Sequence, residues 1–389
     1  MPGWRTANSA VPAAQPLTHH LPGLPWACPR DCRHPSDAPI PSPRLAMKVA
    51  VLSYPTLFQT VGGLRMKVGR TVDALNRRGI QAELLDPVRQ KLADFDLVHV
   101  FAPYNGNHRI VEQAKSDGVP VVMSTILNIP MSYWAGHRAR LISRAVGRLS
   151  HWDLTTDFAQ IAAAMRDADH LIALGKTEQR SLIEGYGIPA NKVSIVRNGV
   201  GEEFFRATPA AFLSKYRVPQ PFVLHTGMIG SVKNQIGLIR ALKNETVNIV
   251  LIGYCAKSEQ PQLDACLAEG GARVHYLNEL PHGELIASAY AAAAVVAIPS
   301  RHEGMPNSIL EGLAADKPVV LTNKHSMDID LPTDAAIQVG PDDHAGIHRA
   351  VMGFLRQPPP PGRARSVVSA LSWAAVADEL AAIYRKVQA

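Results

Sequence analysis

Cysteine is scarce in this chain, with four residues among 389. So few cysteines cannot form the dense disulfide network of a small secreted protein, and they favour a reducing compartment. Long hydrophobic runs are also missing, because no stretch of about 18 uncharged apolar residues occurs, so the sequence predicts no membrane-spanning helix.

Charge of one sign is not strongly dominant either. Forty Lys and Arg residues face 33 Asp and Glu, which leaves a net charge of +7. This mild excess suits anionic ligands or an anionic surface, but it is too small and too scattered to indicate nucleic acid as a partner. With 47% hydrophobic and 19% charged residues the composition is that of a globular protein, and the length predicts two domains.

The first 46 residues differ from the rest, because they hold ten of the thirty prolines and show no apolar periodicity. Cys28, Cys32 and His34 allow two interpretations, an incomplete metal site or incidental residues of a disordered tail, and the missing fourth ligand favours the tail. At Met47 a strand-like run, MKVAVLSY, begins abruptly. We therefore predict a disordered, Pro-rich extension over 1–46 and a functional start at Met47.

Apolar strands alternate with helical stretches from Met47 onward, which is typical of parallel α/β sheets with helices on both faces. Two such series, separated by a Pro-containing stretch at 200–221, predict an α/β fold of two doubly wound, Rossmann-like domains facing across a cleft. The cleft is the expected binding site, since ligands bind beyond the carboxyl ends of parallel strands. The expected strands are 47–53, 80–85, 96–101, 119–124, 170–174, 192–196, 222–226, 247–252, 272–276, 294–298, 318–321 and 335–339, and a last helix spans 366–387.

The stretch 294–321 carries the most information. A buried strand ends at Pro299, a loop with Glu303 follows, and a helix begins near Pro306 with Glu311 about a turn and a half inside. The unpaired N–H groups at a helix start suit a phosphate, and the two carboxylates can contact different parts of one ligand. A surface loop with a solvated helix Glu is the alternative, and the coincidence of all these features makes it the weaker one.

The segment HEGMPNSILEGLA resembles the signature of the retaining glycosyltransferases of family 4, in which two glutamates are separated by seven residues and the fold is GT-B. The resemblance covers nearly all of 47–389, with a glycine loop after the first strand, the RNGV turn at 197–200, a G…KN loop at 227–234 and a closing SW…IY helix. It implies an acceptor-side domain over 47–204, a nucleotide-sugar donor domain over 205–362, and a C-terminal helix over 363–389 that packs back on the first domain.

The resemblance also implies roles for single residues. Glu303 is expected to contact the donor hexose and Glu311 the ribose hydroxyls, while the backbone of the residues between them lies near the diphosphate and the sugar. These residues are Gly304, Met305, Pro306, Asn307 and Ser308.

Two glycine loops are further candidates for the donor phosphates. Gly62 and Gly63 follow the first strand and precede a helix, where a Gly-Gly pair either cradles a phosphate or only makes a tight turn. Gly227 follows the first strand of the second domain, and Lys233 beyond it either neutralises a diphosphate or is an exposed lysine at a helix start. The family usually has an arginine directly after this glycine, where this chain has Met228.

Metal ligation and the histidines give weaker signals. Neither Asp94-Phe95-Asp96 nor Asp328-Ile329-Asp330 has supporting ligands, so we expect no catalytic metal and no cofactor other than the co-substrate. His99 and His137 stand near strand ends or cleft loops as candidates for acceptor or sugar contact, although such histidines more often have a structural role.

The segment 136–149 contains four arginines and no acidic residue. At helical spacing Arg140, Arg144 and Arg148 form one stripe, and Leu141, Ala145 and Leu149 a neighbouring one. Such a helix either binds an anionic membrane surface or packs on the core with a solvated basic edge.

Together with the resemblance, these patterns predict a retaining glycosyltransferase. It would transfer a hexose from a nucleotide-diphosphate sugar to a glycan or lipid-linked acceptor in surface polysaccharide (lipopolysaccharide) biosynthesis, in the cytoplasm or peripherally on the inner face of the plasma membrane. The alternatives are a catalytically weak sugar-nucleotide-binding partner protein, which Met228 favours, and a GT-B sugar-nucleotide epimerase.

Overall fold

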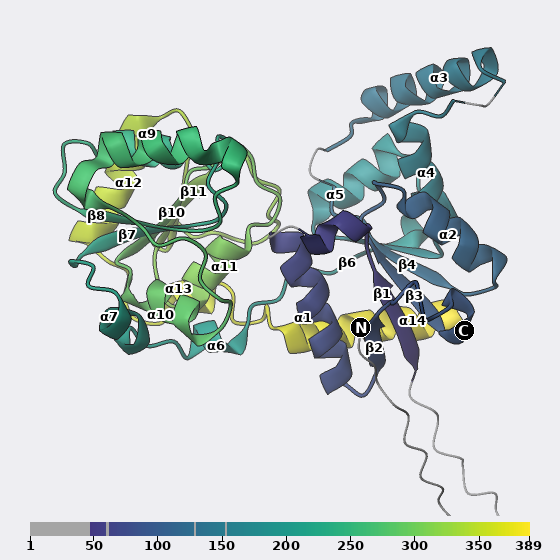
Figure 1. The fold of residues 1–389 in the computed structure, drawn as a ribbon, viewed down its shortest axis with the longest axis horizontal. Coiled ribbons are helices and arrows are strands. Elements are labelled where there is room, and N and C mark those ends of the chain that lie inside the picture. Colours follow the sequence, from purple (N-terminus) through teal and green to yellow (C-terminus); the bar gives the residue numbers. More distant parts are fainter. Residues whose placement is uncertain (1–46, 60–61, 128–129, 152–153) are drawn as a thin grey trace, which may run out of the picture. The chain divides into compact units, whose positions relative to one another are not determined.

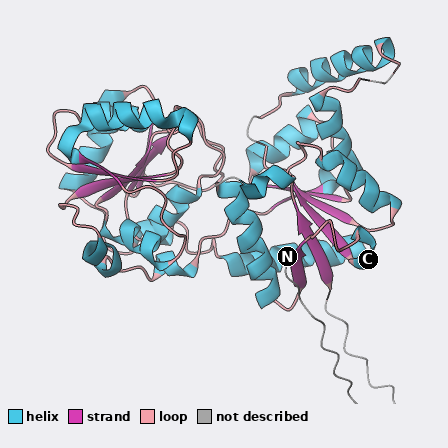
Figure 2. Cartoon of the chain, in the orientation of Figure 1, coloured by secondary structure: helices cyan, strands magenta, loops and turns pink. Residues whose placement is uncertain are grey.

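Two parallel six-stranded sheets form the framework of the chain (Figures 1 and 2). The structure is a computed structural model that describes residues 47–59, 62–127, 130–151 and 154–389, so the predicted extension over 1–46, with Cys28, Cys32 and His34, lies outside the described residues. All twelve predicted strands are present within one or two residues of their expected ends.

The first sheet has the strand order β2-β1-β3-β4-β5-β6. Its inner strands are buried and mostly apolar, as expected for a parallel sheet that is covered on both faces, whereas the edge strand over Gln81–Leu84 is largely exposed. They are β1 (Lys48–Leu52), β2 (Gln81–Leu84), β3 (Leu97–Phe101), β4 (Val121–Ser124), β5 (His170–Ala173) and β6 (Val193–Ile195).

Helices cover this sheet on both faces. They are α1 (Gly63–Arg77), α2 (Asn107–Ser116), α3 (Tyr133–Leu149), α4 (Asp157–Asp167) and α5 (Lys176–Arg180), and a π-helical turn (Ser181–Gly185) extends α5. Short 3-10 turns lie at Pro55–Gln59, Leu92–Asp94 and Ala190–Lys192. Helix α3 begins three residues before its predicted start, because the Ser132 hydroxyl accepts from Ala135 N at 3.3 Å and caps the helix there.

The second sheet has the strand order β12-β11-β10-β7-β8-β9. Strands β7 and β10 are neighbours in this sheet although two further strands separate them along the chain. The strands are β7 (Phe222–Thr226), β8 (Asn248–Ile252), β9 (Val274–Tyr276), β10 (Val295–Ile298), β11 (Val319–Thr322) and β12 (Ala336–Val339).

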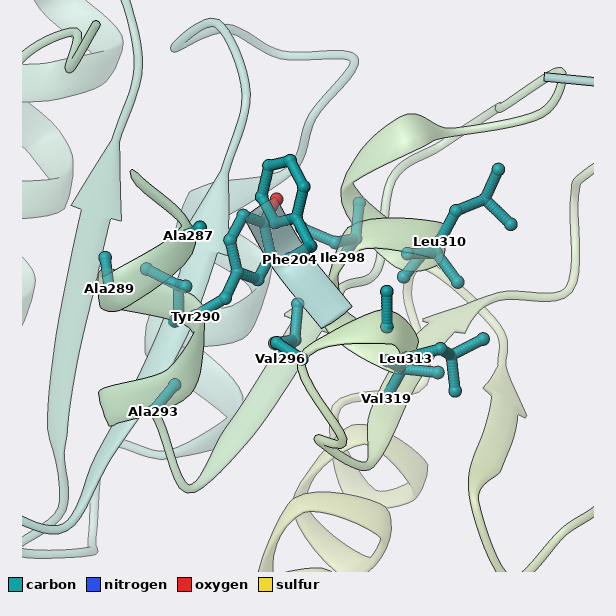
Figure 3. Close-up of a cluster of buried hydrophobic side chains, with 14 of the residues drawn as sticks. Phe204, Ala287, Ala289, Tyr290, Ala293, Val296, Ile298, Leu310, Leu313 and Val319 are labelled. Carbon is teal, nitrogen blue, oxygen red and sulfur yellow. The ribbon is translucent and has the colours of Figure 1, made fainter. Parts of the chain in front are cut away.

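The helices around the second sheet are shorter on average than those around the first sheet. They are α6 (Glu202–Phe205), α7 (Ala210–Lys215), α8 (Gln235–Ala241), α9 (Gln260–Gly270), α10 (Glu284–Ala292), α11 (Asn307–Ala314), α12 (His344–Arg356) and α13 (Arg363–Ser366), with 3-10 turns at Lys257–Glu259 and Gly271–Arg273. Under one face of the sheet, α6, α10 and α11 share a core in which the Phe204 and Tyr290 rings meet edge to face at 5.5 Å (Figure 3). This core fixes the position of α11, the helix that carries Glu311.

The last helix returns to the first sheet, as predicted. Helix α14 (Trp373–Gln388) lies against α1 (Figure 1), and Arg78, directly after α1, pairs with Asp378 at 2.7 Å. The prediction of one continuous helix over 366–387 is wrong in detail, because α13 ends at Ser366 and the Ser372 hydroxyl, which accepts from Ala375 N at 3.1 Å, starts a separate helix. The predicted domain boundaries at 204/205 and 362/363 stay predictions.

Candidate functional site

The strand order of the second sheet creates a switch point between β7 and β10. From these two neighbouring strands the chain continues in opposite directions across the sheet. In open parallel sheets ligands bind beyond the carboxyl ends of the strands at such a point. The loop after β7 contains residues 227–234, and the loop after β10 contains residues 299–306. These are the two loops that the sequence indicated.

The two loops are joined by backbone and side-chain hydrogen bonds. Arg301 N donates to Val232 O at 2.8 Å, and Asn234 Nδ2 donates to Pro299 O at 2.9 Å. Asn234 adopts a left-handed backbone (φ 55°), a conformation that asparagine tolerates better than most residues and that orients this amide. The loops therefore form one unit at the end of the sheet.

Lys233 and Glu303 form an ion pair across these loops, with 2.6 Å between Lys233 Nζ and Glu303 Oε1. The Glu303 side chain is 9% exposed and the Lys233 side chain 27%. Glu303 is also held through its backbone, since its N–H donates to Lys324 O at 2.9 Å and its carbonyl accepts from Ser326 N at 3.2 Å. A carboxylate on a fixed backbone with a cation beside it can orient hydroxyl groups, and the cation can exchange to an anionic ligand.

Gly227 is the residue at which the chain leaves β7. Its φ of 142° is one that residues with a side chain rarely adopt. The carbonyl oxygen of Gly227 also lies close to Gly253, since a Cβ on Gly253 would come within 1.9 Å of this oxygen. Met228 is 47% exposed. The methionine that replaces the family's usual arginine therefore does not belong to the apolar core.

Glu311 lies in α11 and is nearly buried, at 9% exposure. The Tyr290 hydroxyl donates to Glu311 Oε2 at 2.8 Å, and the same hydroxyl is hydrogen bonded to Thr226 at the end of β7. Burial, followed by the nearby Glu311 charge, raises the pKa of Tyr290 well above its usual value, so the phenol stays a proton donor. Tyr290 thus fixes one carboxylate oxygen of Glu311.

The other oxygen of Glu311 faces His282, with 3.3 Å between Oε1 and His282 Nε2. Arg70 of α1 approaches the second ring nitrogen, Nδ1, at 3.4 Å. Because a guanidinium only donates, Nδ1 is the acceptor in the contact with Arg70. Arg70 also pairs with Glu203. A small cavity of about 10 Å³ adjoins Glu311, and its lining comprises Met66, Arg70, Gly199, Gly201, Phe204, His282, Asn307, Glu311 and Trp373.

The residues between the two glutamates form the start of α11, which begins at Asn307. Pro306 precedes the first helical residue. Asn198 of the RNGV turn donates through Nδ2 to Met305 O at 3.2 Å and to Asn307 Oδ1 at 2.9 Å. Gly304, like Gly62 and Gly63 at the start of α1, borders open space, since a Cβ there would meet no other atom within 4 Å. Ser308 is half-buried.

The structure does not place His99 where an acceptor could reach it. The ring is fully buried in the first sheet, Nδ1 contacts the Tyr384 hydroxyl at 2.6 Å, and Nε2 contacts the Ser124 hydroxyl at 2.9 Å. Burial, with a smaller effect of Lys67, lowers the pKa of His99 to about 3. The interpretation of His99 as an acceptor contact is therefore corrected to a structural role that ties β3 to α14.

His137, the other candidate, lies on the exposed side of α3, stacked on Tyr133 with ring centroids 6.3 Å apart. The two acidic pairs that resemble metal motifs have other partners. Asp96 accepts from Lys48 N at 2.7 Å and Asp328 pairs with Arg197 at 3.4 Å. In the described part of the chain no three His, Cys, Asp or Glu residues gather into a group that could hold a metal ion.

Sequence reasoning missed Tyr290, His282 and Arg70. Tyr290 has a weak signal, since it is the one phenol in an otherwise alanine-rich apolar helix directly before β10. His282 and Arg70 have none, because only the folded chain brings a loop residue and a residue of α1 to Glu311.

Two parallel Rossmann-like sheets with a last helix that returns to the first define the GT-B fold. Residues 49–204 match the family described as Glycosyltransferase Family 4, and residues 220–357 match the one described as Glycosyl transferases group 1. The chain belongs to this family of glycosyltransferases, which confirms the resemblance seen in the sequence.

Curated relatives and solved structures agree with this assignment. O-antigen chain mannosyltransferase B of Escherichia coli is 26% identical over 206 residues, which cover 50% of this chain and 53% of the relative. D-inositol 3-phosphate glycosyltransferase of Xylanimonas cellulosilytica is 29% identical over 177 residues, 41% of each chain. The chain thus matches about half the length of these relatives or less.

Among solved structures, HepE of Anabaena in complex with UDP superposes with a TM-score of 0.67 at 16% identity, covering 87% of this chain and all of that one. A sucrose-phosphate synthase of Thermosynechococcus elongatus gives a TM-score of 0.64 at 16% identity, covering 87% of this chain and 98% of the other. These likenesses show the fold.

Proposed function

We propose that this protein is a retaining glycosyltransferase that transfers a hexose from a nucleotide-diphosphate sugar to an acceptor hydroxyl. The observation that carries the proposal is the pairing of Lys233 with Glu303 at 2.6 Å at the β7/β10 switch point, with Glu311 held by Tyr290 on the helix that follows. In this proposal Lys233 serves the phosphates, and the two carboxylates serve the sugar and the ribose separately.

The proposed division of roles follows from these contacts. Tyr290 stays bonded to Glu311 Oε2, and Oε1, which has His282 Nε2 at 3.3 Å, accepts from the ribose hydroxyls as well. Lys233 moves from Glu303 to the diphosphate, which frees the Glu303 carboxylate to accept from hydroxyls of the hexose. The N–H groups at the start of α11 and the backbone at Gly62, Gly63, Gly227 and Gly304 supply further donors for the phosphates.

The main catalytic task in this proposal is electrostatic. Negative charge grows on the diphosphate as its bond to the sugar breaks, and fixed donors stabilise that charge more than they stabilise the bound donor. Retention of configuration is compatible with the leaving phosphate acting as the base for the acceptor hydroxyl on the same face of the sugar. No step in this scheme needs a metal ion.

The relatives guide the choice of substrates. Two of them are named as O-antigen chain mannosyltransferases, and one solved neighbour is a lipopolysaccharide outer core galactosyltransferase. We propose a glycan or lipid-linked acceptor of surface polysaccharide synthesis, used at the cytoplasmic face of the membrane. The UDP bound by HepE makes uridine nucleotides the first to test.

The experiment begins with thermal unfolding of the full chain against a panel of nucleotide sugars, because a bound ligand raises the melting temperature by mass action. The stabilising donor is then used to assay transfer and donor hydrolysis in wild type, Glu303→Gln and the control Glu112→Gln, an exposed glutamate of α2. We expect activity in the wild type and the control and its loss in Glu303→Gln. Donor binding without turnover in the wild type would instead support the catalytically weak binding protein that Met228 favours.

A further inference from the structure

Helix α3 exposes apolar side chains on one side along most of its length. Five of the twelve large hydrophobic residues that are exposed in the described chain lie in this one helix. Leu149 is 84% exposed, Trp134 73%, Ile142 56%, and Leu141 and Tyr133 51% each. Such a concentration on a 17-residue helix marks an interaction surface rather than scattered surface residues.

The opposite side of α3 is the one that packs on the protein. Gly136 and Gly147 are buried, and a Cβ on Gly136 would lie 1.8 Å from Gly185 O, so the helix meets the π-helical turn at backbone distance. Ser143 bonds Thr156 at the start of α4 at 2.6 Å. Helix α3 contacts α4 and the π-helical turn, and Figure 1 shows it next to α4. At about 100° per residue, Trp134, Leu141, Ala145 and Leu149 fall on the side away from these contacts.

Arginines accompany the apolar side chains. The side chains of Arg138, Arg144 and Arg148 are exposed, and none of these side chains has an ion pair or hydrogen bond to another residue that the structure describes. Arg140 does not belong with them, since its Nη1 donates to Gly185 O at 2.7 Å. The predicted basic stripe of Arg140, Arg144 and Arg148 is therefore corrected: Arg138 replaces Arg140 on the outer face.

We propose that the outer face of α3, formed by Trp134, Arg138, Leu141, Ile142, Arg144, Arg148 and Leu149, docks on an anionic lipid bilayer. The apolar side chains would enter the headgroup boundary while the arginines extend to lipid phosphates. Trp134, near the first turn, has the amphipathic ring that favours the membrane interface. Helix α3 would lie on the membrane, and within the described residues no helix has the length and apolarity needed to span one.

The charge of the outer face of α3 favours a lipid surface over a second copy of the chain as its binding partner. The segment 133–149 contains no acidic residue, so two copies of this face would bring arginines against arginines. An anionic leaflet complements all three outer arginines at once. The inference deepens the proposed function, because a lipid-linked acceptor requires the enzyme to work at a membrane surface.

The test uses sedimentation of the full chain with vesicles of phosphatidylcholine alone or with phosphatidylglycerol added. We expect binding to the anionic vesicles that weakens as salt rises, since ions screen the attraction. Replacing Arg138, Arg144 and Arg148 by Gln should weaken partitioning on the order of 100-fold, at about fivefold for each arginine near the surface. The control removes the same charge elsewhere, by Arg89→Gln, Arg109→Gln and Arg206→Gln, and should bind as the wild type.

Two further variants test which face of α3 contacts the vesicles. Arg140→Gln should leave vesicle binding unchanged, because this side chain faces Gly185, whereas Leu141→Gln with Ile142→Gln should weaken it. Equal binding to neutral and anionic vesicles, or a triple arginine variant that binds like the wild type, would overturn the proposal. So would failure to bind any vesicle together with self-association that Leu141→Gln/Ile142→Gln abolishes. Calorimetric titration of nucleotide sugar into the same variants tests the donor site separately, so the two proposals can fail independently.

Discussion

Replacing Lys233 by alanine tests the donor site most directly, and its first consequence is on stability. The substitution leaves Glu303, whose side chain is 9% exposed, without the ammonium at 2.6 Å. Exposed ion pairs contribute about 0–1 kcal/mol, whereas breaking a buried pair costs about 3–5 kcal/mol. Because Lys233 is 27% exposed, we expect an intermediate loss of roughly 2–3 kcal/mol.

The second consequence is on the rate of transfer. Removing a fixed donor from a site where anionic charge develops costs about 100- to 1,000-fold in kcat. We therefore expect Lys233→Ala to lower kcat by this order, while nucleotide-sugar affinity falls less than about tenfold, since the charge grows only in the transition state. Steady-state kinetics with the identified donor and acceptor, together with calorimetric titration of the nucleoside diphosphate, measures both quantities.

Two controls separate these consequences. Lys233→Ala combined with Glu303→Gln removes both charges and should recover stability without recovering the rate. Met228→Arg should partly rescue the rate of Lys233→Ala, because residue 228 is 47% exposed and an arginine there needs no burial. A folded Lys233→Ala variant that transfers sugar at the wild-type rate would refute the role of Lys233.

The remaining predictions concern Glu311 and two buried histidines. Glu311→Ala should weaken nucleoside diphosphate binding tenfold or more in calorimetry, at about 1.5–3 kcal/mol for each lost charge-assisted bond, and unchanged affinity would remove Glu311 from the site. Tyr290→Phe should weaken the same affinity about three- to tenfold, since it frees one Glu311 oxygen, and an affinity equal to wild type would show that Tyr290 only packs. Burial lowers the pKa of His99 to about 3 and of His225 to about 4, so both are neutral in the fold but protonated in the unfolded chain below pH 6.5. Their contribution to stability is present above pH 6.5 and is lost as the pH falls toward about 3 for His99 and about 4 for His225. The free energy of unfolding in urea should therefore be lower at pH 5.0 than at pH 6.5 by about 1.6 kcal/mol for each histidine, and His99→Gln should remove its share.

The fold was predictable because local and global signals agree along this chain. Strands such as Val295–Ile298 are short apolar runs with no polar face, and only a sheet covered on both sides can accommodate them. The errors fell at helix ends, where single side chains decide. Ser132 and Ser372 start α3 and α14 through hydroxyl caps that the apolar pattern does not show.

The site was predictable only where its residues are neighbours along the chain. Glu303 and Glu311 flank one loop and one helix start, so spacing indicated them. The prediction for His99 was wrong, because its position in a strand suggested that the ring faces the cleft. Its ring is instead bonded to the buried hydroxyl of Tyr384, which lies 285 residues further along the chain and which no local pattern indicates. Tyr290 and His282 reach Glu311 through tertiary packing, which no local pattern records.

The charges around the β7/β10 switch point explain why the exchange of Lys233 is central to the proposal. Glu303 and Glu311 bring two negative charges and Lys233 one positive charge, so the three together repel a diphosphate. The start of α11 compensates in part, with a positive charge of about half a unit. In this proposal Lys233 turns to the donor diphosphate, and the sugar hydroxyls replace it at Glu303. A nucleoside diphosphate without its sugar leaves Glu303 unpaired, so it should bind more weakly than the intact donor, and Glu303→Gln should narrow that difference. Calorimetric titration of the nucleoside diphosphate and of the intact donor into wild type and Glu303→Gln measures this difference. If both proteins prefer the intact donor to the same degree, the sugar does not replace Lys233 at Glu303.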